Sequence, residues 1–154
     1  MAGELERLRA IRDRIARAAG VVAVGAGDDA AVIRPEPAMD TVVSTDLLVE
    51  GVHFERSWTT PELLGRKAVA ISLSDMAAMG ADPRAVFLSL ALPADVTDAY
   101  LEQFYIGATA VADRFGVTIA GGDLSSSPGP LLVDSVVTGA VETGKALLRS
   151  GARS

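Results

Sequence analysis

The 154-residue chain has no cysteine, a single histidine and few aromatic residues. Without cysteine it has no disulfide framework, no thiolate nucleophile and no zinc–thiolate site, and such usage is typical of a cytosolic protein. One histidine does not make a histidine metal cluster. Because 49% of the residues are apolar and only 5% are aromatic, we expect a core of Ala, Val and Leu. The length is that of one domain and suffices to bury such a core.

The chain also lacks an excess of basic charge and a long apolar run. Its formal net charge of -6 disfavours nonspecific binding to nucleic acid, which requires a basic face. Phosphate chemistry stays open, because bound metal ions can supply positive charge. No stretch is apolar over the roughly 20 residues that span a bilayer, and the first residues predict a charged helix rather than a signal sequence. We therefore expect a cytoplasmic protein whose partners include neither nucleic acid nor a membrane.

Apolar periodicity and turn residues predict helices that alternate with strands. Helices are predicted over residues 4–18, from Thr60 to about Met79 and from Thr97 to about Arg114. The second and third begin at a cap residue and end before a glycine, as helix ends often do. Strands are predicted over 21–24, 30–34, 41–48, 85–92, 117–120 and 131–142, and loops over 35–40, 50–58 and 124–130. This mixed α/β order, without a repeat or a linker, predicts one domain over residues 1–154.

The helix predicted from Thr60 carries one unusual charge. From Ala68 to Ala81 the only charged residue is Asp75. It shares a stripe at near-helical spacing with apolar residues, namely Leu64, Ala68, Ile71 and Ala78. A carboxylate on a buried stripe is costly unless it is paired, protonated or bound to a metal ion. We expect Asp75 to be buried and to meet a cation, with a purely structural hydrogen-bond acceptor as the alternative.

Three more acidic motifs follow small residues near predicted strand ends: Gly27-Asp28-Asp29, Ser44-Thr45-Asp46 and Gly121-Gly122-Asp123. Carboxylates and hydroxyls are the ligands that Mg²⁺ prefers, and this ion often bridges such groups to the phosphates of a substrate. Several carboxylates gathered without paired basic residues would repel one another unless cations filled the site. The pattern therefore predicts a site for metal ions and a nucleoside triphosphate.

Each motif also has a plainer interpretation. Gly-Asp-Asp and Gly-Gly-Asp are common turn sequences, and Ser-Thr-Asp can cap a structure. His53 alone is more typical of a loop residue than of a ligand. Thr143-Gly144-Lys145 lacks the upstream glycine of a phosphate-binding loop. No Ser-His-Asp or Cys-His arrangement can be argued, so the residues by themselves lead to a metal–phosphate site and no further.

Taken in order, the motifs resemble the N-terminal half of the thiamine-monophosphate kinase family. The string is Gly-Asp-Asp-Ala-Ala-Val (27–32), Ser-Thr-Asp-Leu-Leu-Val-Glu-Gly-Val-His-Phe (44–54), Leu-Gly-Arg-Lys-Ala (64–68), Ser-Asp-Met-Ala-Ala-Met-Gly-Ala-Asp-Pro-Arg (74–84), Leu-Ala-Leu-Pro (90–93), Gly-Gly-Asp (121–123) and Arg-Ser-Gly-Ala (149–152). The resemblance covers nearly the whole chain. Aminoimidazole ribonucleotide synthetase, selenophosphate synthetase and a hydrogenase maturation factor share the wider superfamily, but the stretches at 49–54 and 74–81 are most similar to the thiamine enzymes.

The resemblance implies a fold and a reaction. The implied fold is an α/β domain with a mixed sheet flanked by helices, and two copies would pair their sheets into a barrel in a homodimer. The implied reaction uses ATP and several Mg²⁺ ions to phosphorylate thiamine monophosphate to the diphosphate by direct transfer. No residue needs to act as a nucleophile, because the acceptor is already a phosphate oxygen. Catalysis would then consist of positioning and charge neutralisation.

The resemblance also assigns roles to individual residues. The implied metal ligands are Asp28, Ser44, Thr45, Asp46, Asp75 and Asp123. The implied nucleotide contacts are Tyr105, Gly122, Asp123 and Arg149. His53 matches a position that contacts the thiamine substrate, which reverses the plainer interpretation of that residue. Asp29, which follows the first ligand, is a weaker candidate.

Two departures from the family pattern affect these expectations. Leu124 stands where the family usually has Thr, which removes a hydroxyl next to Asp123. The sequence stops at Ser154, where the family continues with Pro-Gly-Asp and a second domain that is absent here. We expect the chain to fold, to dimerise and to show little kinase activity alone. The alternatives are another ATP-dependent kinase or synthetase of the superfamily and a noncatalytic dimerisation or nucleotide-binding module.

Overall fold

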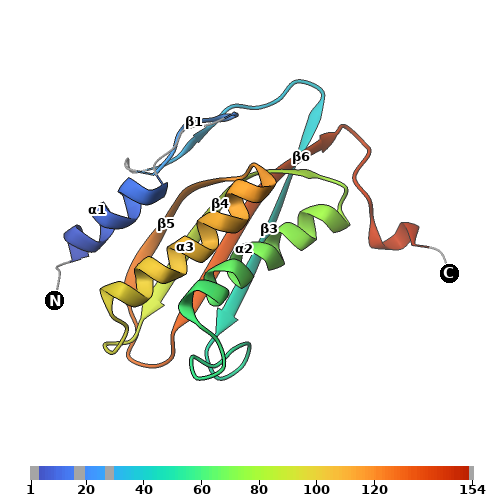
Figure 1. The fold of residues 1–154 in the computed structure, drawn as a ribbon. Coiled ribbons are helices and arrows are strands. Elements are labelled where there is room, and N and C mark those ends of the chain that lie inside the picture. Colours follow the sequence, from blue (N-terminus) through green and yellow to red (C-terminus); the bar gives the residue numbers. More distant parts are fainter. Residues whose placement is uncertain (1–3, 16–19, 27–29, 153–154) are drawn as a thin grey trace.

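The computed structural model describes residues 4–15, 20–26 and 30–152 (Figure 1). In chain order the elements are α1 (Glu4–Ile15), β1 (Val22–Val24), β2 (Val32–Ile33), β3 (Met39–Val49), α2 (Pro61–Ala78), β4 (Asp82–Leu92), α3 (Asp98–Phe115), β5 (Thr118–Ser126), β6 (Leu132–Glu142) and a short 3₁₀ helix, η1 (Arg149–Gly151). The structure confirms the predicted α/β class. In the described part of the chain, no helix is both long and apolar enough to cross a bilayer.

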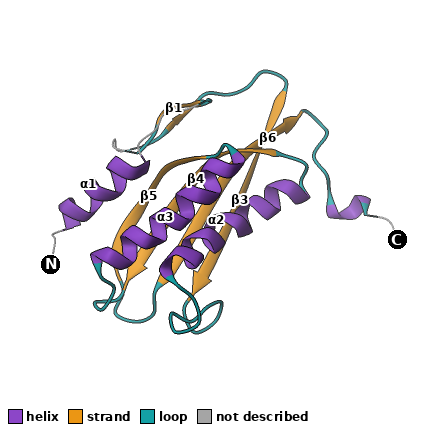
Figure 2. Ribbon diagram, viewed as in Figure 1, coloured by secondary structure: helices purple, strands orange, loops and turns teal. Residues whose placement is uncertain are grey.

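A four-stranded mixed sheet forms the centre of the domain, with the strand order β3-β6-β4-β5. Strand β6 is antiparallel to both of its neighbours, whereas β4 and β5 are parallel. Helices α2 and α3 lie side by side on one face of this sheet (Figure 2). Strands β1 and β2 form a separate small antiparallel pair. The sheet therefore has one face covered by helices, and we call its other side the open face.

The core lies between the two helices and the sheet. Its largest fully buried side chains include Phe104, Leu64, Met76, Leu88 and Leu131. Phe104 and Tyr105 meet edge to face with ring centroids 5.3 Å apart, and most remaining core residues are Ala, Val and Leu, as predicted. Burying a Val or Leu side chain contributes about 1.5–3 kcal/mol, so this layer is the main source of stability.

Both long helices begin and end where the sequence predicts. The hydroxyls of Thr60 and Thr97 each accept a hydrogen bond from a backbone N–H three residues later, at 3.2 Å. Such a bond satisfies one of the donors that a helix leaves unpaired at its start. Helix α3 ends at Gly116, whose φ of 65° lies in the left-handed region that glycine adopts without steric cost.

The sequence-based prediction for residues 121–126 is wrong. The residue types predict a turn at Gly121, Gly122 and Asp123 and a loop over 124–130, but β5 continues to Ser126. The pairing with β4 shifts between Val86 and Phe87, which indicates a bulge in the ladder. At Gly122, φ is 152° and a Cβ atom added to the backbone would lie 1.8 Å from the carbonyl oxygen of Leu88. Pairing with β4 thus overrides the turn preference of the two glycines.

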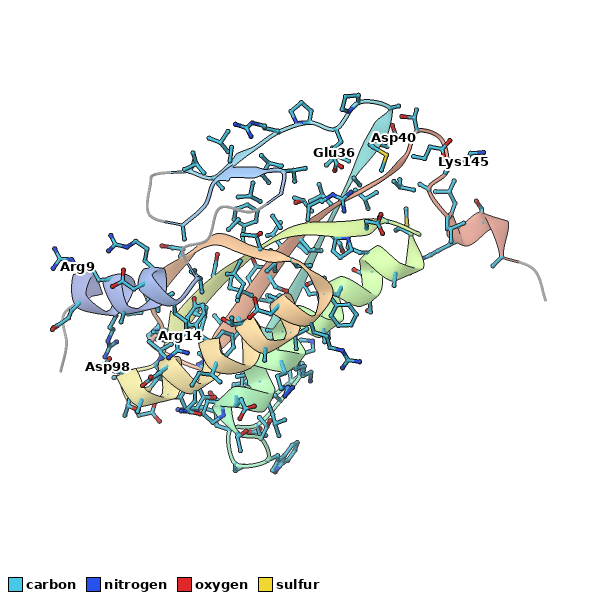
Figure 3. The ribbon with its side chains drawn as sticks, turned by 45° about the horizontal axis from the view of Figure 1, so that its top comes forward. Arg9, Arg14, Glu36, Asp40, Asp98 and Lys145 are labelled. Atoms are coloured by element: carbon cyan, nitrogen blue, oxygen red, sulfur yellow. The ribbon has the colours of Figure 1, made fainter. Side chains whose placement is uncertain are left out.

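Other element boundaries differ less. Strand β2 contains only Val32–Ile33 of the predicted 30–34, whereas β3 and β4 begin earlier than predicted, at Met39 and Asp82. Helix α1 ends at Ile15, and residues 16–18 of the predicted helix lie outside the described residues. Ion pairs Arg14–Glu102 and Arg7–Asp98 attach α1 to α3, and Figure 3 shows Arg14 and Asp98 at this junction. Helix α1 therefore borders the β5 edge of the sheet.

Candidate functional site

Strand β3 separates the predicted ligands of the Ser-Thr-Asp motif onto two faces. Successive side chains of a strand point to opposite sides. Ser44 and Asp46 face α2 and make hydrogen bonds to it, so Thr45 lies on the open face, where it is exposed. Ser44 and Asp46 are half-buried. The motif therefore lies within a strand and does not cap one.

Asp75 on α2 is in direct contact with Ser44 on β3. The hydroxyl of Ser44 donates a hydrogen bond to Oδ2 of Asp75. The prediction that Asp75 is buried is wrong, because its side chain lies at the edge of the interface and is only half-buried. The buried residues of α2 are Leu64, Gly65, Ala68, Val69, Ser72, Leu73 and Met76. This face is rotated by roughly a quarter turn from the predicted stripe, at the 100° per residue of a helix.

A second polar connection lies deeper between α2 and the sheet, and the sequence analysis did not identify its serines. The hydroxyl of Ser72 lies 3.0 Å from Oδ2 of Asp46 and 2.5 Å from the hydroxyl of Ser135 on β6. Ser72 and Ser135 are 0% and 1% exposed. Asp46 and Ser135 are also directly opposite each other in the β3–β6 ladder. The only signal in the sequence was a polar residue at a helical position within an apolar run.

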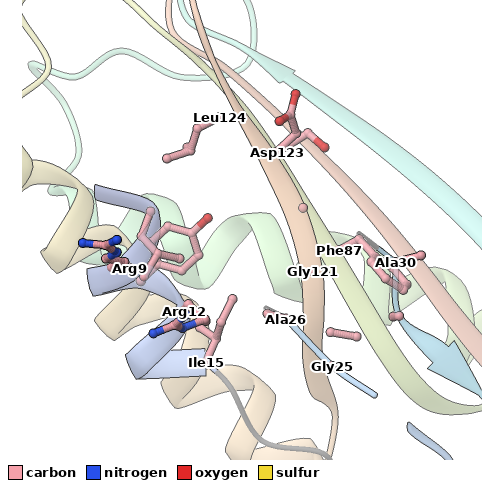
Figure 4. Close-up of a pocket in the computed structure, with 16 residues that line it drawn as sticks. Arg9, Arg12, Ile15, Gly25, Ala26, Ala30, Phe87, Gly121, Asp123 and Leu124 are labelled. Carbon is pink, nitrogen blue, oxygen red and sulfur yellow. The ribbon is translucent and has the colours of Figure 1, made fainter. Parts of the chain in front are cut away.

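Three of the predicted nucleotide contacts line one cavity of about 780 Å³: Tyr105, Gly122 and Asp123. The cavity lies at the β5 edge, between α1 and the β4–β5 pair, and is also lined by Arg9 and Arg12 (Figure 4). Burial raises the pKa of Tyr105 well above its usual range, so its hydroxyl stays protonated and can donate a hydrogen bond. Asp123 is exposed. This cavity combines carboxylate, phenol and guanidinium groups around a glycine backbone.

A second cavity, of about 870 Å³, is lined by three other predicted site residues. Ser44 and Asp75 line it together with Arg149 and Ser150 of η1. The side chains of Leu147 and Leu148 also border it, and the N–H of Leu147 donates a hydrogen bond to the carbonyl of Met79 at 3.0 Å. The C-terminal segment is thereby held against the end of α2. Arg149 thus lines the same cavity as Asp75, while Tyr105 and Asp123 line the other one.

Within one copy, the predicted metal ligands that the structure describes do not all lie close together. Paired residues form a row across the sheet, from Asp46 through Ser135 and Leu88 to Gly122. Asp46 lies on the edge strand β3, and Asp123, which follows Gly122, lies on the opposite edge strand β5. Three strand spacings separate the two edges, which is about 14 Å. Two oxygens bound to one Mg²⁺ ion lie at most about 4 Å apart. In the described ranges, no three His, Asp or Glu side chains are close enough to hold one ion.

Asp28 cannot be placed, because residues 27–29 lie outside the described residues.

His53 lies in an exposed turn that follows the end of β3, the strand that contains Asp46. Its Nδ1 accepts a hydrogen bond from the N–H of Val49 at 3.0 Å, so a neutral ring carries its proton on Nε2. Lys67 donates to the carbonyl of His53 at 2.6 Å. The histidine turn is therefore fixed to both β3 and α2.

An ion-pair network supports the same turn. Arg56 donates from Nε to Glu50 at 2.6 Å and from Nη1 to Asp95 at 3.0 Å. The other carboxylate oxygen of Glu50 accepts from the N–H of Leu131 at 3.0 Å. Burial alone would raise the pKa of Glu50, but the hydrogen bonds from Arg56 and Leu131 outweigh it and hold that pKa below its usual value. Glu50 thus ties the end of β3 to the segment before β6.

Comparison with known proteins gives a consistent set of relatives. The family model described as AIR synthase related protein, N-terminal domain, matches residues 27–141. Thiamine-monophosphate kinase of Synechococcus elongatus is 42% identical over 127 residues, covering 82% of this chain and 38% of that protein. The enzyme of that name in Escherichia coli K12 is 38% identical over 151 residues, covering 98% of this chain and 45% of that protein. The chain thus spans less than half the length of these relatives.

Solved structures give the same result. Thiamine-monophosphate kinase from Stenotrophomonas maltophilia superimposes with a TM-score of 0.75 at 36% identity, over 92% of this chain and 42% of that one. A structure described as AaThiL complexed with AMPPCP and TMP gives 0.71 at 32% identity, over 98% of this chain and 45% of that one. The hydrogenase maturation protein HypE in complex with ATP gives 0.75 at 19% identity, over 99% of this chain and 44% of that one, which supports the fold alone.

Proposed function

The chain belongs to the AIR synthase related proteins, whose N-terminal domain it contains, and from this premise we propose that it is the ATP-binding half of a thiamine-monophosphate kinase. In this proposal ATP phosphorylates thiamine monophosphate to thiamine diphosphate in the cytoplasm. The observation that carries the proposal is the likeness, at 32% identity over 98% of this chain, to a structure with AMPPCP and TMP. AMPPCP is an ATP analogue, and its pairing with TMP matches the proposed substrates.

We further propose that the acidic side chains hold Mg²⁺. The donor set fits this ion, because Asp46, Asp75 and Asp123 offer carboxylate oxygens and Ser44 and Thr45 offer hydroxyls. Asp28 completes the set. Bound Mg²⁺ would neutralise the charge of the transferred phosphoryl group. The chain's own contribution is to place these oxygens, to receive the nucleotide near Tyr105 and Gly122, and to hold the thiamine substrate near His53.

The separation of these residues within one chain leads to a proposal about assembly. Thr45 and Asp123 lie on the open face, as do the half-exposed or exposed apolar side chains of Val43, Leu47 and Phe87. Two sheets stack face to face at about 10 Å, so a second copy can approach both residues from that side. We propose a homodimer in which the β3 region of one copy and the Gly-Gly-Asp region of the other form one site. Such an arrangement is isologous and produces two equivalent sites.

Calorimetric titration with ATP, with and without Mg²⁺, tests the binding part of this proposal. We expect heat of binding that depends on Mg²⁺, weaker binding by Asp123→Asn, and unchanged binding by Asp113→Asn, whose side chain is exposed near the end of α3. Equal binding in EDTA, or equal binding by both variants, would contradict the proposal. We also expect little turnover of thiamine monophosphate by this chain alone, because its relatives are more than twice as long.

A second candidate function is a noncatalytic module that binds nucleotide or dimerises. The observation in its favour is that the acidic residues remain in separate cavities within a single copy. A third interpretation is another ATP-dependent kinase or synthetase of the superfamily. Assays of a full-length relative with other acceptor phosphates would distinguish it from the thiamine-monophosphate kinase. Dimerisation without any Mg²⁺-dependent binding of ATP would favour the noncatalytic module over the kinase half.

A further inference from the structure

Ser72 and Ser135 form the most deeply buried polar contact between a helix and the sheet in the described part of the chain. Both hydroxyls are shielded from water, at 0% and 1% exposure. A buried hydroxyl without a partner costs about 1–3 kcal/mol, so the two must be hydrogen-bonded to be tolerated. They bond to each other at 2.5 Å, and Ser72 also contacts Oδ2 of Asp46 at 3.0 Å.

The direction of these bonds follows from the number of protons. A serine hydroxyl has one proton to donate, and an ionised carboxylate only accepts. Ser72 must therefore donate to Asp46, and Ser135 must donate to Ser72. The two hydrogen bonds therefore run in the same direction, from Ser135 on β6 through Ser72 on α2 to Asp46 on β3. Because two hydroxyl dipoles point the same way, each strengthens the bond that the other makes.

Ser72 on α2 fixes one oxygen of Asp46, and Ser135 on β6 in turn fixes the hydroxyl of Ser72. Asp46 and Ser135 occupy directly opposite positions of the β3–β6 ladder, and the hydroxyl of Ser72 on α2 contacts both side chains. The nearby bond from Ser44 to Asp75 runs the other way, with the hydroxyl on the strand and the carboxylate on the helix. Each carboxylate is thus engaged through Oδ2 across the same helix–strand interface. The remaining oxygen, Oδ1, is the one that would meet a metal ion.

We propose that Ser72, supported by Ser135, is a positioning residue that orients the Asp46 carboxylate for metal binding. This inference rests on the proposed function, in which Asp46 is a ligand of Mg²⁺. Outer-shell hydrogen bonds of this kind typically change metal affinity by about 10- to 100-fold when they are removed. The competing explanation is structural, namely that the two serines only satisfy each other and anchor α2 to the sheet.

Binding of Mn²⁺ as a probe ion, measured by electron paramagnetic resonance on the full 154-residue chain, separates the two explanations. We expect Ser72→Ala to weaken Mn²⁺ binding by about 10-fold or more. The matched control is Ser74→Ala on the same helix, because Ser74 is exposed and donates only to the carbonyl of Ile71 in its own helix, at 2.6 Å. That control should bind Mn²⁺ as the unaltered chain does.

A second variant makes the test independent of stability. Ser72→Ala leaves the Ser135 hydroxyl without its acceptor, whereas Ser72→Ala/Ser135→Ala removes both hydroxyls and leaves no unpaired donor. Thermal unfolding in EDTA should therefore recover in the double variant, while Mn²⁺ binding stays weak. Recovery of Mn²⁺ binding together with stability, or no loss of binding in Ser72→Ala, would overturn the positioning role.

Asp46→Asn distinguishes failure of this inference from failure of the proposed function. If Asp46→Asn loses Mn²⁺ and Ser72→Ala binds normally, the positioning role fails and the ligand assignment stands. If Asp46→Asn binds Mn²⁺ like the unaltered chain, both fail. Absence of Mn²⁺ binding by the unaltered chain at millimolar metal would also overturn both, since Asp46 would then hold no ion in this chain.

Discussion

The two edge strands of the sheet present their predicted site residues in different ways. On β3, the side chains of Ser44 and Asp46 are half-buried against α2 and joined to it by the hydrogen bonds Ser44–Asp75 and Asp46–Ser72. On β5, Asp123 is exposed in a wide cavity, and the local shape comes from the backbone of Gly121 and Gly122. The β3 region is organised by side-chain hydrogen bonds, whereas the β5 region is organised by a close backbone approach of Gly122 to Leu88 that only glycine allows. Substitutions should therefore affect them through different mechanisms.

The largest effect is expected from Gly122→Ala on β5. Its φ of 152° is unfavourable for alanine, and the added carbon would lie 1.8 Å from the carbonyl oxygen of Leu88. We expect a loss of about 2–4 kcal/mol in the free energy of unfolding, measured by chemical denaturation. Gly129→Ala is the control, because nothing lies within 4 Å of its added carbon. Equal stability of the two variants would show that the close approach of β5 to Leu88 does not depend on glycine.

Asp75→Asn should act on β3 and α2 without unfolding the protein. Asparagine keeps an oxygen that accepts from Ser44, and Asp75 is only half-buried, so the melting temperature should change little. We expect the Kd for ATP in the presence of Mg²⁺ to rise at least about tenfold, or ~1.4 kcal/mol. Calorimetry and thermal unfolding measure the two quantities. Unchanged binding of ATP would remove Asp75 from the ligand set.

Leu47→Lys tests whether the open face pairs with a second copy. Leu47 is 52% exposed on β3 and lies on the same side as Thr45. A lysine there would place an unpaired charge in the proposed interface, so we expect a dimer dissociation constant at least about tenfold higher by light scattering. Leu63→Lys is a matched control, since Leu63 is 54% exposed on α2, which covers the other face. Similar dissociation of both variants would argue against pairing through this face.

The smallest effect is expected from lowering the pH, which acts on stability through Glu50 at the end of β3. Because the folded-state pKa of Glu50 is lowered, its contribution is present above the unfolded value of 4.5 and is lost as pH falls through the folded pKa. We expect about 1 kcal/mol of pH-dependent stability, absent in Glu50→Gln. Hydrogen exchange of Leu131 N–H, compared with an amide of β5, should show the loss at β3 and β6 only. A Glu50→Gln variant with the same acid profile would contradict this.

The helix ends and most strands could be predicted because their signals are local. A cap at Thr60, a cap at Thr97 and a stop at Gly116 each depend on residues within one turn of the helix. The course of β5 could not be predicted, since Gly121 and Gly122 favour a turn by themselves and extend only because β4 pairs with them. Tertiary pairing of this kind leaves no local pattern.

The candidate site shows the same limit. Asp75 could be identified as unusual from the apolar residues around it, but its half-buried place depends on how α2 rotates against the sheet. Ser72 looked like any serine in an apolar run, and only the fold places it between Asp46 and Ser135. The alternation of β3 was readable in principle, and it would have assigned Thr45 to the opposite face from Asp46. The distance between the edge strands required the strand order, which the sequence does not encode locally.

The central claim is that the β3 and β5 regions complete each other between two copies of the chain. Calorimetric titration of an equimolar mixture of Thr45→Val and Asp123→Asn with ATP and Mg²⁺, after subunit exchange, tests it most directly, because both residues lie on the open face. If each site takes Thr45 from one copy and Asp123 from the other, mixed dimers contain one intact site, and about a quarter of all sites should bind as in the unaltered protein. Binding no better than that of either variant alone would mean that both residues serve one site within a single chain, and would contradict the account.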